Sequence, residues 1–122
     1  MGQGLCKPDV SAVEVTSNER QDVEKLIKTE PVVVFVKTFC PHCLSTKQLL
    51  KSHNVEMTVI DLNKEADGHK TQAVLFAIAK QKTVPNTFIG GEHIGGNDDL
   101  QKLAKPGLLK EILNQHNIPN SF

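Results

Sequence analysis

The segment at positions 40–43, Cys-Pro-His-Cys, holds the residues most able to do chemistry. Its two thiols, Cys40 and Cys43, are about one helical turn apart, so their sulfur atoms can form a disulfide. The segment follows the apolar run Val32–Val36 and the cation Lys37, and Pro41 suits the first position of a helix. At a helix N-terminus, unpaired N–H groups and the positive end of the macrodipole favour a thiolate and lower the pKa of a thiol. We therefore predict that Cys40 is the exposed nucleophile and Cys43 the more buried resolving thiol.

A pair of cysteines with this spacing is also half of a structural zinc site. Such a site needs two more ligands, and the third cysteine, Cys6, lies alone near the start of the chain. The histidines outside the segment are scattered without the spacing of a ligand pair: His53, His69, His93 and His116. We therefore expect a redox pair and no metal.

Composition narrows the class of protein further. The 122 residues include 14 Lys+Arg and 14 Asp+Glu, so the net charge is zero, which argues against a nucleic-acid binder that works by counterion release. No apolar run approaches the roughly 20 residues of a membrane span. The odd number of cysteines and the absence of a hydrophobic leader favour a reducing compartment. We expect one cytoplasmic, monomeric domain at residues 17–122, preceded by a flexible extension at residues 1–16.

The pattern of apolar residues predicts the elements that position the two cysteines. A helix capped by Ser17 or Asn18 ends before Pro31, and the continuous apolar run at residues 32–36 indicates a strand buried on both faces. A helix from Pro41 to about His53 and a strand at residues 57–60 complete a right-handed βαβ unit. Helix and strand in this order predict an α/β fold.

The second half of the chain continues the same alternation. A helix begins at Asp67 and is ended by the segment at residues 83–85. Strands at residues 86–89 and 92–94 are joined by the two-residue turn Gly90-Gly91. A short helix then opens after the glycines at 95 and 96, and a final amphipathic helix covers residues 108–113. Together these elements predict a small sheet with helices on both faces.

Three separated motifs in this order resemble a dithiol glutaredoxin. They are KTFCPHC at residues 37–43, TVP at residues 83–85 and GGNDDL at residues 95–100, and the resemblance covers roughly residues 18–116. It implies a thioredoxin-like fold with a four-stranded mixed sheet, and glutathione as co-substrate. It also implies reduction of protein disulfides and of mixed disulfides between glutathione and client proteins.

The resemblance assigns binding roles to several positions. Pro85 is expected in the cis form beside the nucleophile, with the backbone of Val84 pairing to glutathione; the alternative is an ordinary proline at the start of a strand. Lys37 and Gln72 match positions that bind the glycine carboxylate, although Gln72 is also explained as a solvated polar residue. The ring of His42 stands where the family usually has tyrosine, and it adds a group that titrates near neutral pH.

The glycine turn is expected to hold the γ-glutamyl end of glutathione. Its N–H groups, such as that of Gly96, suit a carboxylate, and Asp98 and Asp99 occupy the acidic positions. The alternative is that these acids cap the helix. Asp98 departs from the family's Ser, Thr or Cys and places a second carboxylate where that of glutathione docks.

Two other functions stay open at this point. A thioredoxin-like reductase served by a flavoprotein lacks support because the usual Trp before the first cysteine is absent. A [2Fe–2S] carrier, in which two chains share a cluster through Cys40 and two glutathiones, is disfavoured by Pro41.

The N-terminus partly resembles a myristoylation start, in which Gly2 and Cys6 together would give a two-signal membrane anchor. The alternative is an unmodified tail.

Overall fold

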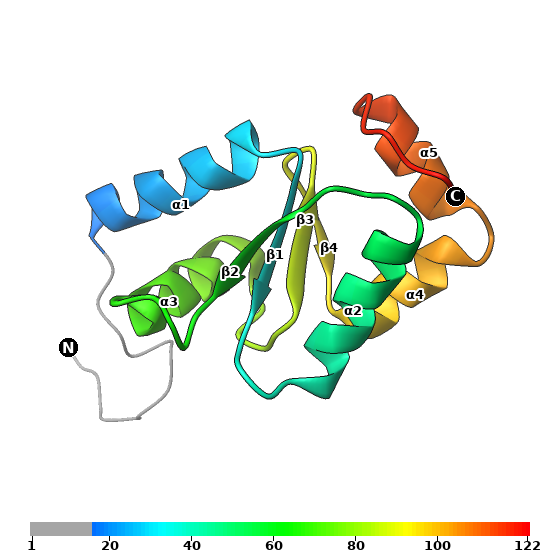
Figure 1. Ribbon diagram of the computed structural model, residues 1–122. Helices are drawn as coiled ribbons and strands as arrows, with labels where there is room; N and C mark the ends of the chain where they lie inside the picture. The colour runs from blue at the N-terminus through cyan, green and yellow to red at the C-terminus, as the bar shows by residue number, and fades with distance from the viewer. Residues whose placement is uncertain (1–15) are drawn as a thin grey trace.

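The computed structural model describes residues 16–122, so the predicted extension and the Gly2 and Cys6 hypothesis lie outside the described residues. Helices and strands alternate along the chain, and the two groups of helices lie on opposite faces of a central sheet (Figure 1). The elements are α1 (Ser17–Thr29), β1 (Val32–Val36), α2 (Pro41–Ser52), β2 (Thr58–Asp61), α3 (Gly68–Ala79), β3 (Asn86–Ile89), β4 (Glu92–Gly95), α4 (Asn97–Ala104) and α5 (Leu108–Gln115).

The four strands form one mixed sheet in the order β2-β1-β3-β4. Strand β1 pairs in parallel with β2, and β3 runs antiparallel to both β1 and β4. This arrangement confirms the predicted four-stranded mixed sheet. It also places the end of β1, where the two cysteines follow, at the centre of the sheet.

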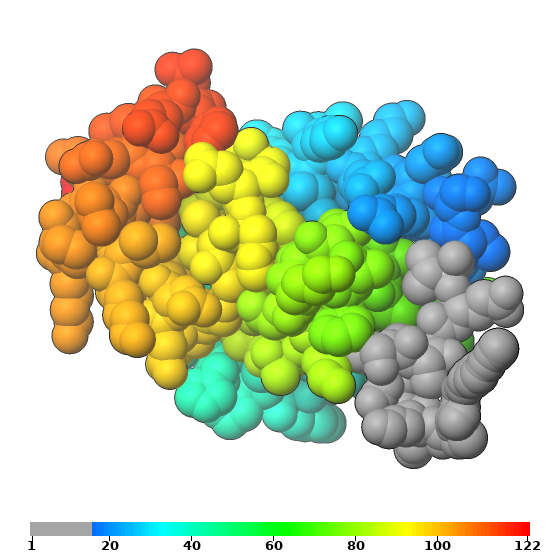
Figure 2. Space-filling view, turned by 180° about the vertical axis from the view of Figure 1, so that it is seen from behind, coloured from blue at the N-terminus to red at the C-terminus, as the bar shows by residue number. Residues whose placement is uncertain are grey.

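Strand β1 is buried along its whole length, as its continuous apolar sequence predicts. The side chains alternate between two cores. Val34 and its neighbours two positions away pack with residues of α2, α4 and α5. Val33 and Phe35 pack on the other face with residues of α1 and α3. The helices therefore divide into two layers, and the β3–β4 hairpin is seen between them from behind (Figure 2).

Several predicted boundaries were wrong by a few residues. The N-cap of α1 is Thr16, not Ser17 or Asn18, because its hydroxyl accepts from the Glu19 N–H while the Glu19 carboxylate accepts from the Thr16 N–H. Helix α3 ends at Ala79, where Lys80 takes a left-handed conformation, and not at residues 83–85. Strand β2 begins one residue later than expected.

The hairpin turn at Gly90-Gly91 is formed as predicted. Both glycines have positive φ, 58° and 85°, which is the conformation that a two-residue hairpin turn of this type requires. No helix among residues 16–122 is long and apolar enough to cross a membrane.

Candidate active site

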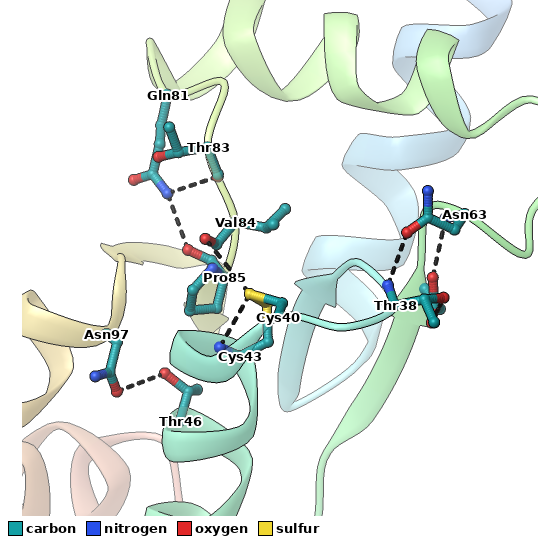
Figure 3. The surroundings of a disulfide bond; sticks show 11 residues. Thr38, Cys40, Cys43, Thr46, Asn63, Gln81, Thr83, Val84, Pro85 and Asn97 are labelled. Atoms are coloured by element: carbon teal, nitrogen blue, oxygen red, sulfur yellow. Dashed lines mark hydrogen bonds between the residues drawn. A yellow bond between two sulfur atoms is a disulfide. The ribbon is translucent and has the colours of Figure 1, made fainter.

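The two cysteines are joined in a disulfide at the start of α2 (Figure 3). Their Cα atoms are 5.1 Å apart, and Cys40 is the N-cap of the helix, where its sulfur accepts from the Cys43 N–H at 3.2 Å. Cys43 is 2% exposed and belongs to the core, whereas Cys40 is half-buried. This asymmetry fits the predicted roles of an accessible nucleophile and a buried resolving thiol.

The Val84–Pro85 segment passes directly beside Cys40 (Figure 3). Its peptide bond is cis, as the resemblance implied. The carbonyl oxygen of Val84 lies 4.0 Å from the sulfur of Cys40. The amide of Gln81 donates to the carbonyls of Thr83 and Pro85, both at 3.0 Å, and so fixes the segment from behind. Sequence reasoning missed Gln81, because its role depends on the path of the loop.

A second set of hydrogen bonds holds the loop before Cys40 from the opposite side. The Thr38 N–H donates to Asn63 Oδ1 at 2.7 Å, and the Thr38 hydroxyl donates to Asp61 Oδ2 at 3.0 Å. Desolvation by itself raises the pKa of Asp61, but the Asn63 N–H, the Thr38 hydroxyl and nearby Lys64 outweigh it and lower the pKa below its usual value. The Asp61 carboxylate is therefore occupied in holding the loop.

The glycine turn forms the N-terminus of α4. Gly96 is the N-cap, and its N–H donates to Asp99 Oδ2 at 3.0 Å. Gly95 has a φ of 113°, and a Cβ there would lie 2.5 Å from the same carboxylate oxygen, so glycine is required. Asp98 is exposed. Of the two roles considered for these acids, the structure gives Asp99 the capping role.

A partly buried hydrogen bond connects the second turn of α2 to the N-terminus of α4. Thr46, which is fully buried on α2, donates from its hydroxyl to Asn97 Oδ1 at 3.0 Å (Figure 3). The amide of Gln101 donates to the same oxygen at 3.2 Å and to the Ser45 hydroxyl at 3.3 Å. These four residues keep the glycine turn at a fixed place beside the cysteines.

The predicted residues Lys37 and Gln72 line one hollow beside β2 and α3. The Gln72 amide donates to the Lys82 carbonyl at 2.6 Å, so it is engaged within the protein. Lys37 also lines a neighbouring open groove that contains Cys40. His42 is exposed on the first turn of α2.

Among residues 16–122, no three His, Cys, Asp or Glu side chains gather in a way that could hold a metal ion. The reactive groups of the site are the thiols of Cys40 and Cys43. A cysteine pair at a helix N-terminus, beside a cis proline and on a four-stranded mixed sheet, defines a thiol-disulfide oxidoreductase of the thioredoxin-like fold.

Comparison with known proteins identifies the family. The family sequence model described as Glutaredoxin matches residues 32–94. Glutaredoxin-1 of Rhizophagus irregularis is 42% identical over 97 residues, which are 80% of this chain and 96% of that protein. The glutaredoxin of Vernicia fordii is 45% identical over 92 residues, 75% of this chain and 88% of that protein. The chain belongs to the glutaredoxin family, and its cysteine pair fits the dithiol motif.

Solved structures agree with this assignment. The crystal structure of a buckwheat glutaredoxin–glutathione complex superimposes with a TM-score of 0.77 at 35% identity, covering 83% of this chain and 96% of that one. A mutated buckwheat glutaredoxin gives a TM-score of 0.79 at 36% identity, covering 82% of this chain and 91% of that one. The thioredoxin-like fold predicted from the sequence is therefore confirmed.

Proposed function

We propose that the protein is a glutathione-dependent oxidoreductase that reduces protein–glutathione mixed disulfides and protein disulfides. The observation that carries this proposal is the half-buried sulfur of Cys40, which is paired with buried Cys43 and lies 4.0 Å from the Val84 carbonyl. A substrate sulfur can reach Cys40, and extended peptide backbone can pair with Val84 beside it.

In the first reaction, the Cys40 thiolate attacks the glutathione sulfur of a mixed disulfide on a client protein. A bond forms between Cys40 and glutathione, the client's sulfur–sulfur bond breaks, and the client thiolate leaves and takes up a proton. The thiolate of a second glutathione then attacks the glutathione sulfur held on Cys40. Oxidised glutathione leaves and the Cys40 thiolate is restored, so the two electrons that reduce the client come from glutathione.

In the second reaction, Cys43 resolves a disulfide between Cys40 and a client protein. The Cys40 thiolate attacks one sulfur of the client's disulfide and releases the other as a thiolate. The Cys43 thiolate then attacks the Cys40 sulfur, forms the Cys40–Cys43 disulfide and frees the client in reduced form. Burial of Cys43 supports this role, because it shields the thiol from incoming disulfides while the sulfur of Cys40 stays within its reach.

Glutathione would lie along the side of Cys40 that faces the cis proline. The hollow lined by Lys37 and Gln72 suits the glycine carboxylate, and the backbone of Val84 suits the central cysteine. The turn at Gly96 would receive the γ-glutamyl group, whose amine is attracted by Asp99, while Asp98 lies where its carboxylate docks. The buckwheat glutaredoxin, a relative at 35% identity, forms a complex with glutathione, which supports this choice of co-substrate.

The proposed partners are therefore glutathione and glutathionylated proteins. We further propose that the protein is a monomer in a reducing compartment such as the cytoplasm, where the odd cysteine count of the chain is not a liability.

The test compares Cys40→Ser with Cys43→Ser on a glutathionylated protein, with glutathione and its reductase as electron source. We expect Cys40→Ser to fall to the background rate. Cys43→Ser should keep much of the deglutathionylation rate and lose the reduction of protein disulfides. Substantial deglutathionylation by Cys40→Ser would overturn the proposal. Faster turnover with thioredoxin reductase in place of glutathione would instead favour a thioredoxin-like reductase.

A further inference from the structure

Phe39, the residue directly before the nucleophile, is 98% exposed although it is a large apolar side chain. Its φ is 59°, a left-handed conformation that is unusual for a bulky residue. The residues on either side of Phe39 are both held in place. Thr38 makes hydrogen bonds to Asp61 and Asn63, and Cys40 is in the disulfide. The backbone therefore holds the Phe39 ring in solvent at the mouth of the site, where no intramolecular packing explains it.

Phe39 borders the open groove that contains Cys40, a hollow of about 570 Å³. Pro41 and Leu44 line the groove with it, and Leu44 is itself 53% exposed. Four large apolar side chains are exposed in the part of the chain that the structure describes, and two of the four lie here. We call the part of the groove formed by Phe39, Pro41, Leu44 and Lys47 the client groove.

The charge around the client groove is positive. Residues 31–55, which include β1 and α2, contain three lysines and no Asp or Glu. Two of these lysines, Lys37 and Lys47, line the groove. One carboxylate, that of Asp61, also borders it, but it accepts from the Thr38 hydroxyl and the Asn63 N–H. An incoming acidic side chain therefore meets cations here and a carboxylate that is already engaged.

The client groove lies on the side of Cys40 away from Val84 and Pro85, and the wider groove adjoins, at Lys37, the hollow proposed for the glycine carboxylate of glutathione. Val84 and Pro85 flank the disulfide on one side, and Thr38 and Asn63 flank it on the other (Figure 3). With the central cysteine of glutathione beside Val84, the client's half of a mixed disulfide leaves Cys40 toward Phe39, Pro41 and Leu44. Any polypeptide whose cysteine reacts with Cys40 therefore crosses the client groove.

We propose that the client groove selects protein substrates whose reactive cysteine is flanked by apolar and acidic residues. The apolar neighbour packs on Phe39 and Leu44, and the acidic neighbour lies beside Lys47. This inference rests on the proposed function and adds a substrate class to it. Phe39 and Lys47 act in docking the client, whereas Cys40 alone performs the attack.

The test uses three glutathionylated peptides of equal length with a central cysteine, flanked by Phe and Glu, by Ser, or by Phe and Lys. The mixed disulfide of glutathione and 2-mercaptoethanol is the small substrate, because it has no polypeptide to dock. The proteins are wild type, Phe39→Ala, Phe39→Tyr, Lys47→Glu and the matched control Leu108→Ala. Leu108 is 45% exposed on α5 and is not among the residues that line the groove.

With the Phe/Glu peptide, Phe39→Ala should lower kcat/KM about fivefold to tenfold, mainly through KM, because one apolar anchor is lost. Phe39→Tyr should restore most of it, and Leu108→Ala should match wild type. Lys47→Glu should lower kcat/KM for the Phe/Glu peptide about threefold and raise it for the Phe/Lys peptide. All variants should act on the small substrate at rates close to wild type.

Three results would overturn the inference. Equal turnover of the three peptides by wild type would show that the groove does not select. If Phe39→Ala lowered kcat/KM equally for the small substrate, the ring would act on the reactivity of Cys40 and not on docking of the client. Dimerisation of the wild type that Phe39→Ala abolishes, without an effect on the peptides, would assign the groove to a second copy. If wild type acts on neither the peptides nor the small substrate, the proposed function itself fails.

Discussion

Two helix N-termini meet at the candidate site, and they are capped in different ways. At α2 the cap is Cys40, whose sulfur accepts from the Cys43 N–H, and the first turn contains no acid. At α4 the cap is Gly96, which has no side chain, and the first turn contains Asp98 and Asp99. The cap N–H of α4 donates to the Asp99 carboxylate. Both ends have unpaired donors and a positive dipole, but only α4 meets them with its own negative charge.

The difference is clear position by position. The second residue of α2 is His42 and that of α4 is Asp98, while the third residues are Cys43 and Asp99. At α2 the favourable field is left for a charge that exists only after reduction, that of the Cys40 thiolate. At α4 the field is already used by fixed carboxylates. One end is thus suited to a transient charge, and the other to a stable helix start.

The largest expected effect comes from removing the fixed charge that caps α4. Asp99→Ala leaves the Gly96 N–H without its carboxylate and should lower the free energy of unfolding by about 1 kcal/mol. Urea unfolding followed by circular dichroism measures it. The control Asp98→Ala removes only a charge from the first turn and should cost about 0.3 kcal/mol. Equal losses in the two variants would show that the Gly96–Asp99 hydrogen bond adds nothing to the effect of the charge.

The bond that joins the second turn of α2 to the N-terminus of α4 should contribute nearly as much. Thr46→Val keeps the side chain's shape but removes the hydroxyl that donates to Asn97, at an expected cost of about 1 kcal/mol. A double-mutant cycle with Asn97→Ala isolates the bond, and urea unfolding should give a coupling of about 0.5–1 kcal/mol. Additive effects of the two substitutions would mean that the Thr46–Asn97 bond does not stabilise the contact between the two helices.

Making α2 resemble α4 should slow the nucleophile. His42→Asp places a carboxylate on the first turn of α2, as at Asp98, and disfavours the Cys40 thiolate. The helix-end interaction is about 0.3–1 kcal/mol, so alkylation of Cys40 at pH 7 should slow about twofold to fivefold. The measurement is the iodoacetamide rate in a Cys43→Ser background, with His42→Asn as neutral control. The same rate for the Asp and Asn variants would contradict the role given to the helix end.

The elements on both sides of this comparison were predictable from sequence because their signals are local. The five apolar residues Val32–Val36 mark a strand buried on both faces, and Pro41 marks the start of α2. The same holds for the turn at Gly90-Gly91. The cap at Thr16 was missed although it carries a local signal, namely a glutamate three residues later at Glu19.

The hydrogen bonds that hold the site were not predictable, because they join residues far apart in the chain. The Thr46–Asn97 bond spans 51 positions, and the Thr38–Asp61 bond spans 23. A hydroxyl or carboxylate at these positions is equally compatible with solvent until the sheet order places the partners together. The exposure of Phe39 was not predictable either, because it follows from a left-handed backbone conformation that the residue type does not indicate.

The reciprocal exchange at α4 should have a smaller effect and depends on the proposed function. Asp98→His removes a carboxylate from the position where that of glutathione docks, so the KM for glutathione should fall about twofold. Steady-state kinetics with the small mixed disulfide measures it, and Asp22→His on α1 controls for the change in net charge. An increase in KM would show that Asp98 attracts the amine of glutathione more than it repels the carboxylate.

The smallest effect concerns a histidine behind the α4 end. The imidazole Nε2 of His93 donates to Asn86 Oδ1 at 2.8 Å. Desolvation lowers the pKa of His93, and the nearby carboxylate of Asp99 offsets this only in part. Because the folded state binds the proton less readily than the unfolded chain, stability should fall as the pH drops below about 6.5, the usual pKa of histidine.

His93→Gln keeps a donor for Asn86 and does not titrate, so it should lose less stability than wild type between pH 7 and pH 5. The urea midpoints of both proteins at the two pH values measure this difference, with His69→Gln, an exposed histidine on α3, as control. Asp99→Ala removes the carboxylate that favours the charged imidazole of His93. In this variant, the part of the pH dependence of stability that is due to His93 should become steeper. An unchanged dependence would mean that the field at the α4 end does not extend to His93.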